Sequence, residues 1–181
     1  MQISNPSDIS VQLGFGKSSD ANDDDELTFE DEEVELETDG ALFEHWTVLM
    51  IDDDEQVHQS TVLALGGEMV LGKRLRFEHA RSAKEGIQKI ESGSAPPDLA
   101  FVDMVMESPD AGLRFAKCAK SNPQWASVKI LLRSGQPGFS NEMEQARSIG
   151  VEGFAQKASI SRSILIQALV ELLSGRNYFM A

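Results

Sequence analysis

Four short apolar runs and one more polar run alternate with five helical segments between residues 46 and 175, and this alternation restricts the fold more than any other feature of the chain. The runs have the length of strands, and the segments between them carry apolar residues at helical spacing. Ser82 and Glu85 form a capping-box pattern, and Gly175 ends the last helix. Consecutive β-then-α units predict a parallel sheet, because parallel strands are joined by right-handed crossovers. We therefore predict an α/β, doubly wound fold with helices on both faces of five strands, Thr47–Ile51, Leu75–His79, Leu99–Asp103, Lys129–Arg133 and Gly153–Gln156.

Polar side chains follow four of these runs at the point where each strand ends. Asp52 and Asp53 follow the first run, Asp103 ends the third, Ser134 follows the fourth, and Lys157 follows the fifth. Ligands of open α/β sheets bind at this carboxyl edge, so we expect the five side chains to lie together there. Three neighbouring carboxylates repel one another, and a divalent cation removes that conflict. Mg²⁺ fits best, because it prefers carboxylates and phosphate oxygens, whereas zinc and copper sites use His or Cys.

The charge of −14 is concentrated at the front of the chain. Residues 1–45 hold 14 acids and one base, and the remaining residues hold 16 acids and 15 bases. We expect 1–45 to be an acidic, disordered leader, 46–175 to be the folded domain, and 176–181 to be a C-terminal tail. An alternative is that the leader docks onto the domain or a partner through its four apolar residues, Leu27, Phe29, Val34 and Leu36.

Several classes of function are excluded by the composition. The chain has no basic stripe for nucleic acid, and its apolar runs are far shorter than the roughly 20 residues of a membrane span. It also lacks the apolar core of a signal peptide. The single cysteine, Cys118, favours a reducing cytoplasm. The three histidines, His45, His58 and His79, are interpreted as ordinary structural residues that do not meet one another.

The residues from about 46 to 175 resemble the receiver domain of bacterial two-component response regulators. Asp52-Asp53 is similar to the acidic pair of that family, and Phe101-Val102-Asp103-Met104-Val105-Met106 to its phosphoacceptor stretch. Ser134-Gly135 resembles its Thr/Ser-Ala pair, and Lys157 its lysine. Phe154 falls at its aromatic switch position. The resemblance implies a flavodoxin-like sheet of order 2-1-3-4-5.

The resemblance also implies a magnesium-dependent signalling module rather than an enzyme. Asp103 would accept a phosphoryl group from a sensor histidine kinase or phosphotransfer protein. Asp53, Asp103 and the backbone carbonyl of Val105 would bind Mg²⁺, with Asp52 acting through water.

Ser134 and Lys157 would hold the resulting acyl phosphate. Movement of Ser134 would let Phe154 turn and change the face formed by the last helix and strand, through which a homodimer would form. Taken singly, Ser134 is better interpreted as a turn residue and Lys157 as a solvated side chain. Taken jointly, they favour a functional site, because each closes an apolar run in the right order.

Two positions depart from the family pattern. Ala158 stands where the family usually has a proline after the lysine, often with a cis bond, so a trans bond here would place Lys157 differently. Glu107 replaces the common proline of D-x-x-M-P.

A finer resemblance links the stretches DDEQVH, VMESPDAGLR and LLRSGQPG to receivers at the amino terminus of HD-GYP-type cyclic-di-GMP signalling proteins. It implies that the chain is the regulatory part of a larger protein, although a stand-alone receiver is an alternative.

Two other functions remain open on the sequence. A haloacid-dehalogenase-like phosphohydrolase would use Asp52 as its nucleophile, but only the two acids of its D-x-D motif are present. A pseudo-receiver would be an interaction module that is not phosphorylated, and the Ala158 loop is the feature that favours it.

Overall fold

The computed structural model describes residues 44–135, 140–157 and 161–180. Most of the acidic leader, its docking segment and Ala158 lie outside these residues, so the expectations about them remain predictions. Within the described part of the chain, no helix is both long and apolar enough to cross a bilayer.

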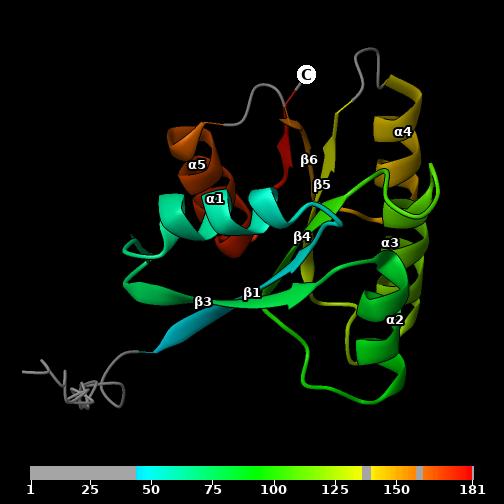
Figure 1. The fold of residues 1–181 in the computed structure, drawn as a ribbon, viewed down its shortest axis with the longest axis horizontal. Coiled ribbons are helices and arrows are strands. Elements are labelled where there is room, and N and C mark those ends of the chain that lie inside the picture. Colours follow the sequence, from blue (N-terminus) through cyan, green and yellow to red (C-terminus); the bar gives the residue numbers. More distant parts are fainter. Residues whose placement is uncertain (1–43, 136–139, 158–160, 181) are drawn as a thin grey trace, which may run out of the picture. The chain divides into compact units, whose positions relative to one another are not determined.

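A seven-stranded sheet in the order β2-β3-β1-β4-β5-β6-β7 forms the centre of the molecule (Figure 1). Its five central strands are mutually parallel and correspond to the five predicted runs. Their order confirms the predicted 2-1-3-4-5 topology. Their bounds are β1 His45–Ile51, β3 Lys73–Ala80, β4 Leu99–Asp103, β5 Lys129–Ser134 and β6 Gly153–Gln156.

Two short edge strands were not predicted. β2 Met69–Val70 pairs antiparallel with β3 through a turn at Leu71 and Gly72, where φ is 50° and 80°. β7 Tyr178–Phe179 pairs parallel with β6 and extends the sheet into the segment expected to be a tail. A strand of two residues is too short to show an alternating pattern, so neither could be recognised from periodicity.

The helices form one layer on each face of the sheet. α1 Glu55–Leu65 and α5 Arg162–Leu173 cover one face, and the other three helices cover the opposite face (Figure 1). Ser82 caps the first of those three as predicted, since its hydroxyl accepts a hydrogen bond from the backbone N–H of Glu85. The three are α2 Ala83–Glu91, α3 Ala111–Ser121 and α4 Ser140–Ile149.

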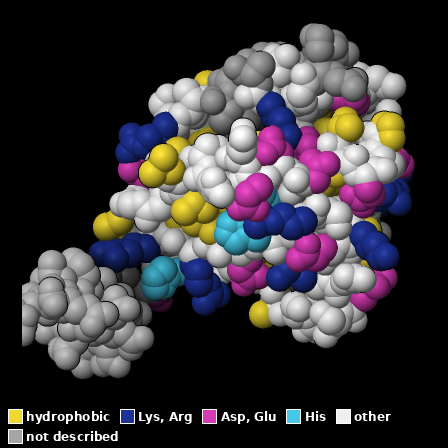
Figure 2. Space-filling view, viewed as in Figure 1, with side chains coloured by type: hydrophobic (Ala, Val, Ile, Leu, Met, Phe, Trp, Pro, Cys, Tyr) yellow, Lys and Arg dark blue, Asp and Glu magenta, His cyan; other side chains and the backbone are white. Residues whose placement is uncertain are grey.

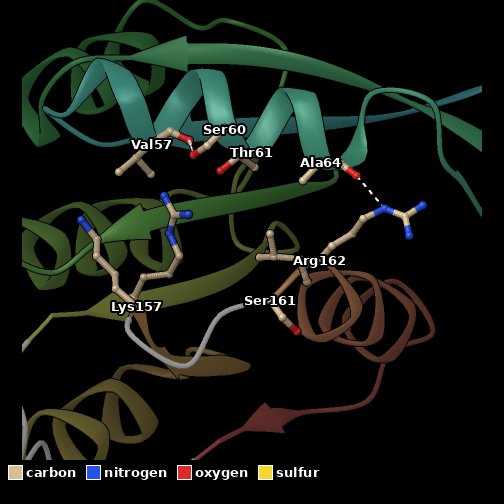
Figure 3. Close-up of a pocket in the computed structure, with 9 residues that line it drawn as sticks. Val57, Ser60, Thr61, Ala64, Lys157, Ser161 and Arg162 are labelled. Carbon is tan, nitrogen blue, oxygen red and sulfur yellow. Dashed lines mark hydrogen bonds between the residues drawn. The ribbon is translucent and has the colours of Figure 1, made fainter.

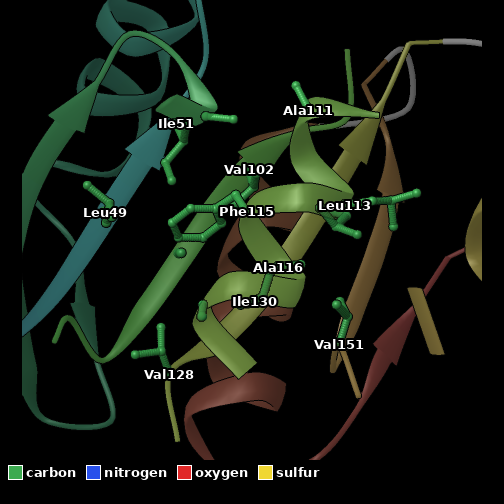
Figure 4. Packing of buried hydrophobic residues seen from close by; sticks show 14 of the residues in the cluster. Leu49, Ile51, Val102, Ala111, Leu113, Phe115, Ala116, Val128, Ile130 and Val151 are labelled. Atoms are coloured by element: carbon green, nitrogen blue, oxygen red, sulfur yellow. The ribbon is translucent and has the colours of Figure 1, made fainter. Parts of the chain in front are cut away.

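Both faces of β4 and β5 are buried, as a parallel sheet requires, whereas β3 keeps several exposed residues. Figure 4 shows α3 placing Phe115 and Ala116 over the strands that carry Val102 and Ile130. Each fully buried Val, Ile or Phe side chain stabilises the fold by about 1.5–3 kcal/mol relative to an exposed one. The core therefore fixes the positions of the carboxyl ends of β1, β4, β5 and β6 relative to one another.

Candidate functional site

Three carboxylates meet at the carboxyl edge of the sheet. β1 pairs with β4 from Val48 to Ile51, so Asp52 and Asp53 emerge beside Asp103 at the end of β4. Oxygen atoms of the three carboxylates all lie within 4.8 Å of one another. Asp52 is fully buried, Asp103 is 4% exposed and Asp53 is open to solvent. Hard oxygen donors with one exposed side fit a small cation such as Mg²⁺ that keeps part of its water shell.

Lys157 connects two of these acids. It follows β6, and its Nζ lies 2.7 Å from Asp103 Oδ2 and 3.1 Å from Asp52 Oδ2. The side chain is 27% exposed, so its ammonium is positioned between the buried acids and solvent. The predicted meeting of Lys157 with the acidic residues is therefore found in the structure.

Arg133 is a residue of this site that the sequence reasoning missed. Its guanidinium is buried and donates from Nη2 to Asp52 Oδ2 at 3.1 Å, while its carbon Cζ lies 5.6 Å from the Phe101 ring centroid. Its Nε has no hydrogen-bond partner among the described residues. The signal was present in the sequence, because a charge inside the apolar run ILLRS must find a partner when its strand is central. Asp52 is thus held by two cations.

The surroundings of Asp103 oppose its ionisation. Burial raises the pKa of this carboxyl, and the neighbouring Asp52 carboxylate raises it further. Lys157 and the backbone N–H of Val105 act in the opposite direction but do not cancel the effect. The anion is therefore less stabilised than in water, which favours its reactivity and its affinity for a cation.

Helix α3 presses directly on the strand that carries Asp103. A Cβ atom on Gly112 would lie 2.3 Å from the backbone oxygen of Asp103 and 2.9 Å from Met104 Cα. The Gly112 N–H donates to the Met104 carbonyl at 3.1 Å. Only glycine permits this approach of a helix start to the strand end.

Ser134 and Phe154 lie on neighbouring strands and share a face of the sheet. Leu132 is level with Phe154, and Ser134 follows two residues later on the same side. The Ser134 hydroxyl donates to Glu142 Oε2 on α4 at 3.1 Å. Phe154 is fully buried in the cluster beneath α3 and α4. The structure therefore links Ser134 to α4 through a hydrogen bond.

Two acids near the site have structural roles. Asp54 caps α1, because its carboxylate accepts a hydrogen bond from the Gln56 N–H at 2.8 Å. Glu107, which departs from the family pattern, accepts from the N–H groups of Ala83 and Lys84 at the start of α2. Both carboxylates lie at helix N-termini, where a negative charge is favourable.

Two histidines meet beside the site, so the expectation that none would is wrong. His58 Nδ1 and His79 Nδ1 are 2.8 Å apart, and His58 Nε2 lies 2.8 Å from the Asp52 backbone oxygen. His79 shares a strand face with Leu75 and Phe77, and that face packs under α1. The contact depends on the packing of α1 over β3, which local periodicity does not specify.

A cavity of about 300 Å³ opens beside the acidic site between α1 and α5. Figure 3 shows Lys157 and Arg162 on one side of it and Ser60 and Thr61 of α1 on the other. Arg133 also lines the cavity. A group that enters it therefore approaches the cations that hold Asp52.

Comparisons with known proteins place these features in context. No protein-family model matches the chain. It is 32% identical over 130 residues to 3'3'-cGAMP-specific phosphodiesterase 2 of Vibrio cholerae, a match that covers 72% of the chain and 25% of the relative. The chain thus spans about a quarter of the length of that protein.

Solved structures with a similar fold include receiver domains and response regulators. The isolated receiver domain of RcsB from Salmonella enterica, determined with a beryllofluoride phosphomimetic, matches with a TM-score of 0.60 and 16% identity, over 76% of this chain and 94% of that one. The phosphorylated cyanobacterial phytochrome response regulator RcpA matches with a TM-score of 0.58 and 16% identity, over 71% and 91%. The Mn²⁺-bound response regulator Rcp1 matches with a TM-score of 0.57 and 12% identity, over 71% and 91%. These similarities establish the fold.

Proposed function

Because the chain has the fold of a response regulator receiver domain, we propose that it is a phosphoacceptor receiver in which Asp103 takes a phosphoryl group from a sensor histidine kinase or phosphotransfer protein in the cytoplasm. The observation that carries this proposal is the contact of Lys157 with Asp103 at 2.7 Å within a cluster of three carboxylates. An ammonium beside a buried nucleophilic carboxylate is the group needed to stabilise a transferring phosphoryl.

In the proposed reaction an Asp103 carboxylate oxygen attacks phosphorus of a phosphohistidine. The new P–O bond forms as the P–N bond breaks, and the imidazole leaves with the electron pair and takes up a proton. Asp53, Asp103 and the Val105 carbonyl would hold Mg²⁺, with Asp52 acting through water. The ion would supply charge neutralisation at the phosphoryl oxygens.

Lys157 and Ser134 would bind the acyl phosphate. To reach it, the Ser134 hydroxyl has to leave Glu142, and this exchange releases a contact between β5 and α4. Phe154 could then turn within the space beside β5. A charge change at one carboxylate would in this way alter the surface formed by α4, β6 and α5.

The cavity between α1 and α5 supports the proposed route of the phosphodonor. It lies beside Lys157 and Arg133 and is lined by three cations and three hydroxyl side chains. This lining suits a phosphorylated imidazole that has to approach Asp103. A homodimer is expected at the last helix and strand. Because β7 pairs with β6 and covers its edge, the dimer contact would be made by the helical surfaces.

We also propose that the receiver regulates a cyclic-dinucleotide phosphodiesterase in the same polypeptide. The relative from Vibrio cholerae carries that activity in its name, and the aligned segment is a quarter of its length. Sequencing the gene beyond codon 181 tests this proposal. A downstream domain of another type would contradict it.

Acetyl phosphate labelling tests the phosphoacceptor role. We expect intact-mass spectrometry with acetyl phosphate and Mg²⁺ to show one added phosphoryl group, which Asp103→Asn abolishes and the exposed-surface control Glu144→Gln retains. Label on Asp52 with repeated turnover would instead support a phosphohydrolase. The structure does not favour that reading, since Asp52 is fully buried and bound by two cations.

Beryllofluoride separates a working receiver from a pseudo-receiver. We expect addition of beryllofluoride and Mg²⁺ to change the amide NMR signals of Ser134 and Phe154. Unchanged spectra at saturating concentrations would favour an interaction module that is not phosphorylated.

A further inference from the structure

Two imidazole rings from α1 and β3 face each other beside the acidic site. Their centroids are 5.0 Å apart and their planes are tilted by 46°. His58 is 1% exposed, whereas His79 is open to solvent. The facing atoms are the two Nδ1 nitrogens, 2.8 Å apart. A buried and an accessible imidazole therefore share one contact.

The tautomer of His58 follows from its second contact. The Asp52 backbone oxygen can only accept, so His58 Nε2 carries the hydrogen in their 2.8 Å contact. In the neutral ring, Nδ1 of His58 then presents a lone pair toward His79. Proteins fix metal-binding imidazoles in this way, with the other ring N–H bound to a carbonyl or carboxylate.

A groove gives access to this pair from solvent. It has a volume of about 460 Å³ and includes both rings together with Glu55 and Arg81. Figure 2 shows histidine side chains at the surface bordered by hydrophobic, acidic and basic residues. At the edge of the groove, the Glu55 carboxylate pairs with Arg81 at 2.6 Å. Because the groove opens to solvent, an ion at the two rings would have water available for its remaining positions.

We propose that His58 and His79 bind one Zn²⁺ ion through their Nδ1 atoms, as a second cation site next to the carboxylates. Imidazole nitrogen suits Zn²⁺, whereas Mg²⁺ takes oxygen ligands, so the two sites differ in donor chemistry. Two nitrogens on a tetrahedral zinc ion lie roughly 3.3 Å apart, given bonds of about 2.0–2.1 Å. The rings must therefore separate by about half an ångström, which the accessible His79 can provide.

Binding of Zn²⁺ to the two neutral rings leaves the number of protons on them unchanged. The neutral pair holds one hydrogen between the two Nδ1 atoms, and that hydrogen belongs to His79 because His58 is the acceptor. On binding, His79 changes to its Nε2–H tautomer, and each ring donates one Nδ1 lone pair to the ion. No net proton is released, and the bond from His58 to the Asp52 carbonyl is retained.

Histidine side-chain nitrogen NMR tests the proposal on tag-free, full-length chain in saturating Mg²⁺. We expect one equivalent of Zn²⁺ to shift the Nδ1 signals of His58 and His79 and to leave those of His45 unchanged. Unshifted Nδ1 signals at saturation would overturn the proposal, whichever other residues bound the ion.

Calorimetric titration with Zn²⁺, again in saturating Mg²⁺, provides a second, independent measurement. We expect His79→Gln to weaken binding by at least about tenfold, while the matched controls His45→Gln and Cys118→Ser leave it unchanged. Equal affinity of His79→Gln and wild type would contradict the proposal, as would displacement of Zn²⁺ by Mg²⁺. The site does not depend on the proposed phosphotransfer, so Asp103→Asn should bind Zn²⁺ normally.

Discussion

Replacement of Arg133 by leucine tests whether the buried ion pair stabilises the acidic site. Arg133 is 3% exposed and contacts the fully buried Asp52 carboxylate at 3.1 Å. Loss of one partner from a buried pair costs about 3–5 kcal/mol, because the other charge remains buried. Lys157 still contacts Asp52 at 3.1 Å in the variant, so we expect a smaller loss in the free energy of unfolding, about 2–3 kcal/mol.

Urea unfolding followed by tryptophan fluorescence measures this loss, with the buried Trp125 as the probe. At a slope of about 1.5–2 kcal/mol per molar urea, the midpoint should fall by about 1–2 M. A domain with an unfolding free energy of about 5–15 kcal/mol remains folded after such a loss. As a matched control, the exposed Arg114→Leu should change the unfolding free energy by less than about 0.5 kcal/mol.

A double-mutant cycle with Asp52→Asn isolates the interaction. We expect a coupling energy of about 1–2 kcal/mol, since the amide no longer requires a positive partner. The same unfolding midpoint for Arg133→Leu and wild type would refute the reasoning, and so would a cycle without coupling. Either result would mean that Lys157 alone neutralises Asp52.

Three further predictions concern other parts of the molecule. The raised pKa of Asp103 means that the folded state holds its proton more tightly, so stability falls as pH rises through the window between the ordinary and the raised pKa. Asp103→Asn should therefore be more stable than wild type above that window without Mg²⁺, and thermal melts should show this advantage shrinking when Mg²⁺ is added. Glu142→Gln weakens the hydrogen bond from Ser134 by about 1 kcal/mol, and should speed acetyl phosphate labelling by up to about fivefold; no change in the labelling rate would argue against a role of that bond in the switch. Phe179→Ala removes a half-buried ring that stacks 4.4 Å from the Arg147 guanidinium, and should lower the unfolding free energy by about 1–2 kcal/mol in urea titrations.

The central fold and the acidic trio could be predicted because both depend on local pattern. Four of the five central strands are short, mainly apolar runs, and the polar residue at the end of each is adjacent in the sequence. Parallel order then brings the termini of β1, β4 and β6 together, which is why Asp103 and Lys157 meet. These features require only the period of a strand and the handedness of its crossovers.

The contacts that escaped prediction all depend on which side chains face each other across elements. Arg133 reaches Asp52 from 81 residues away, and His58 meets His79 only because α1 packs over β3. The hydrogen bond from Ser134 to Glu142 depends on rotamers and on the position of α4. The strand pattern determines which face a residue occupies, but it does not determine its partner on that face.

The close approach of Gly112 to the strand end leaves no free volume behind the proposed acceptor residue. The Asp103 peptide is pressed against the start of α3 on one side and hydrogen-bonded to β5 on the other, since the Met104 N–H donates to the Arg133 carbonyl at 2.9 Å. A closely packed interior of this kind has low compressibility and transmits strain. A new charge on the Asp103 carboxylate therefore cannot be absorbed by a shift of its own backbone. The structural change must therefore occur in side chains around the site. Ser134, Lys157 and their neighbours are the residues that move, whereas β4 and α3 keep their positions.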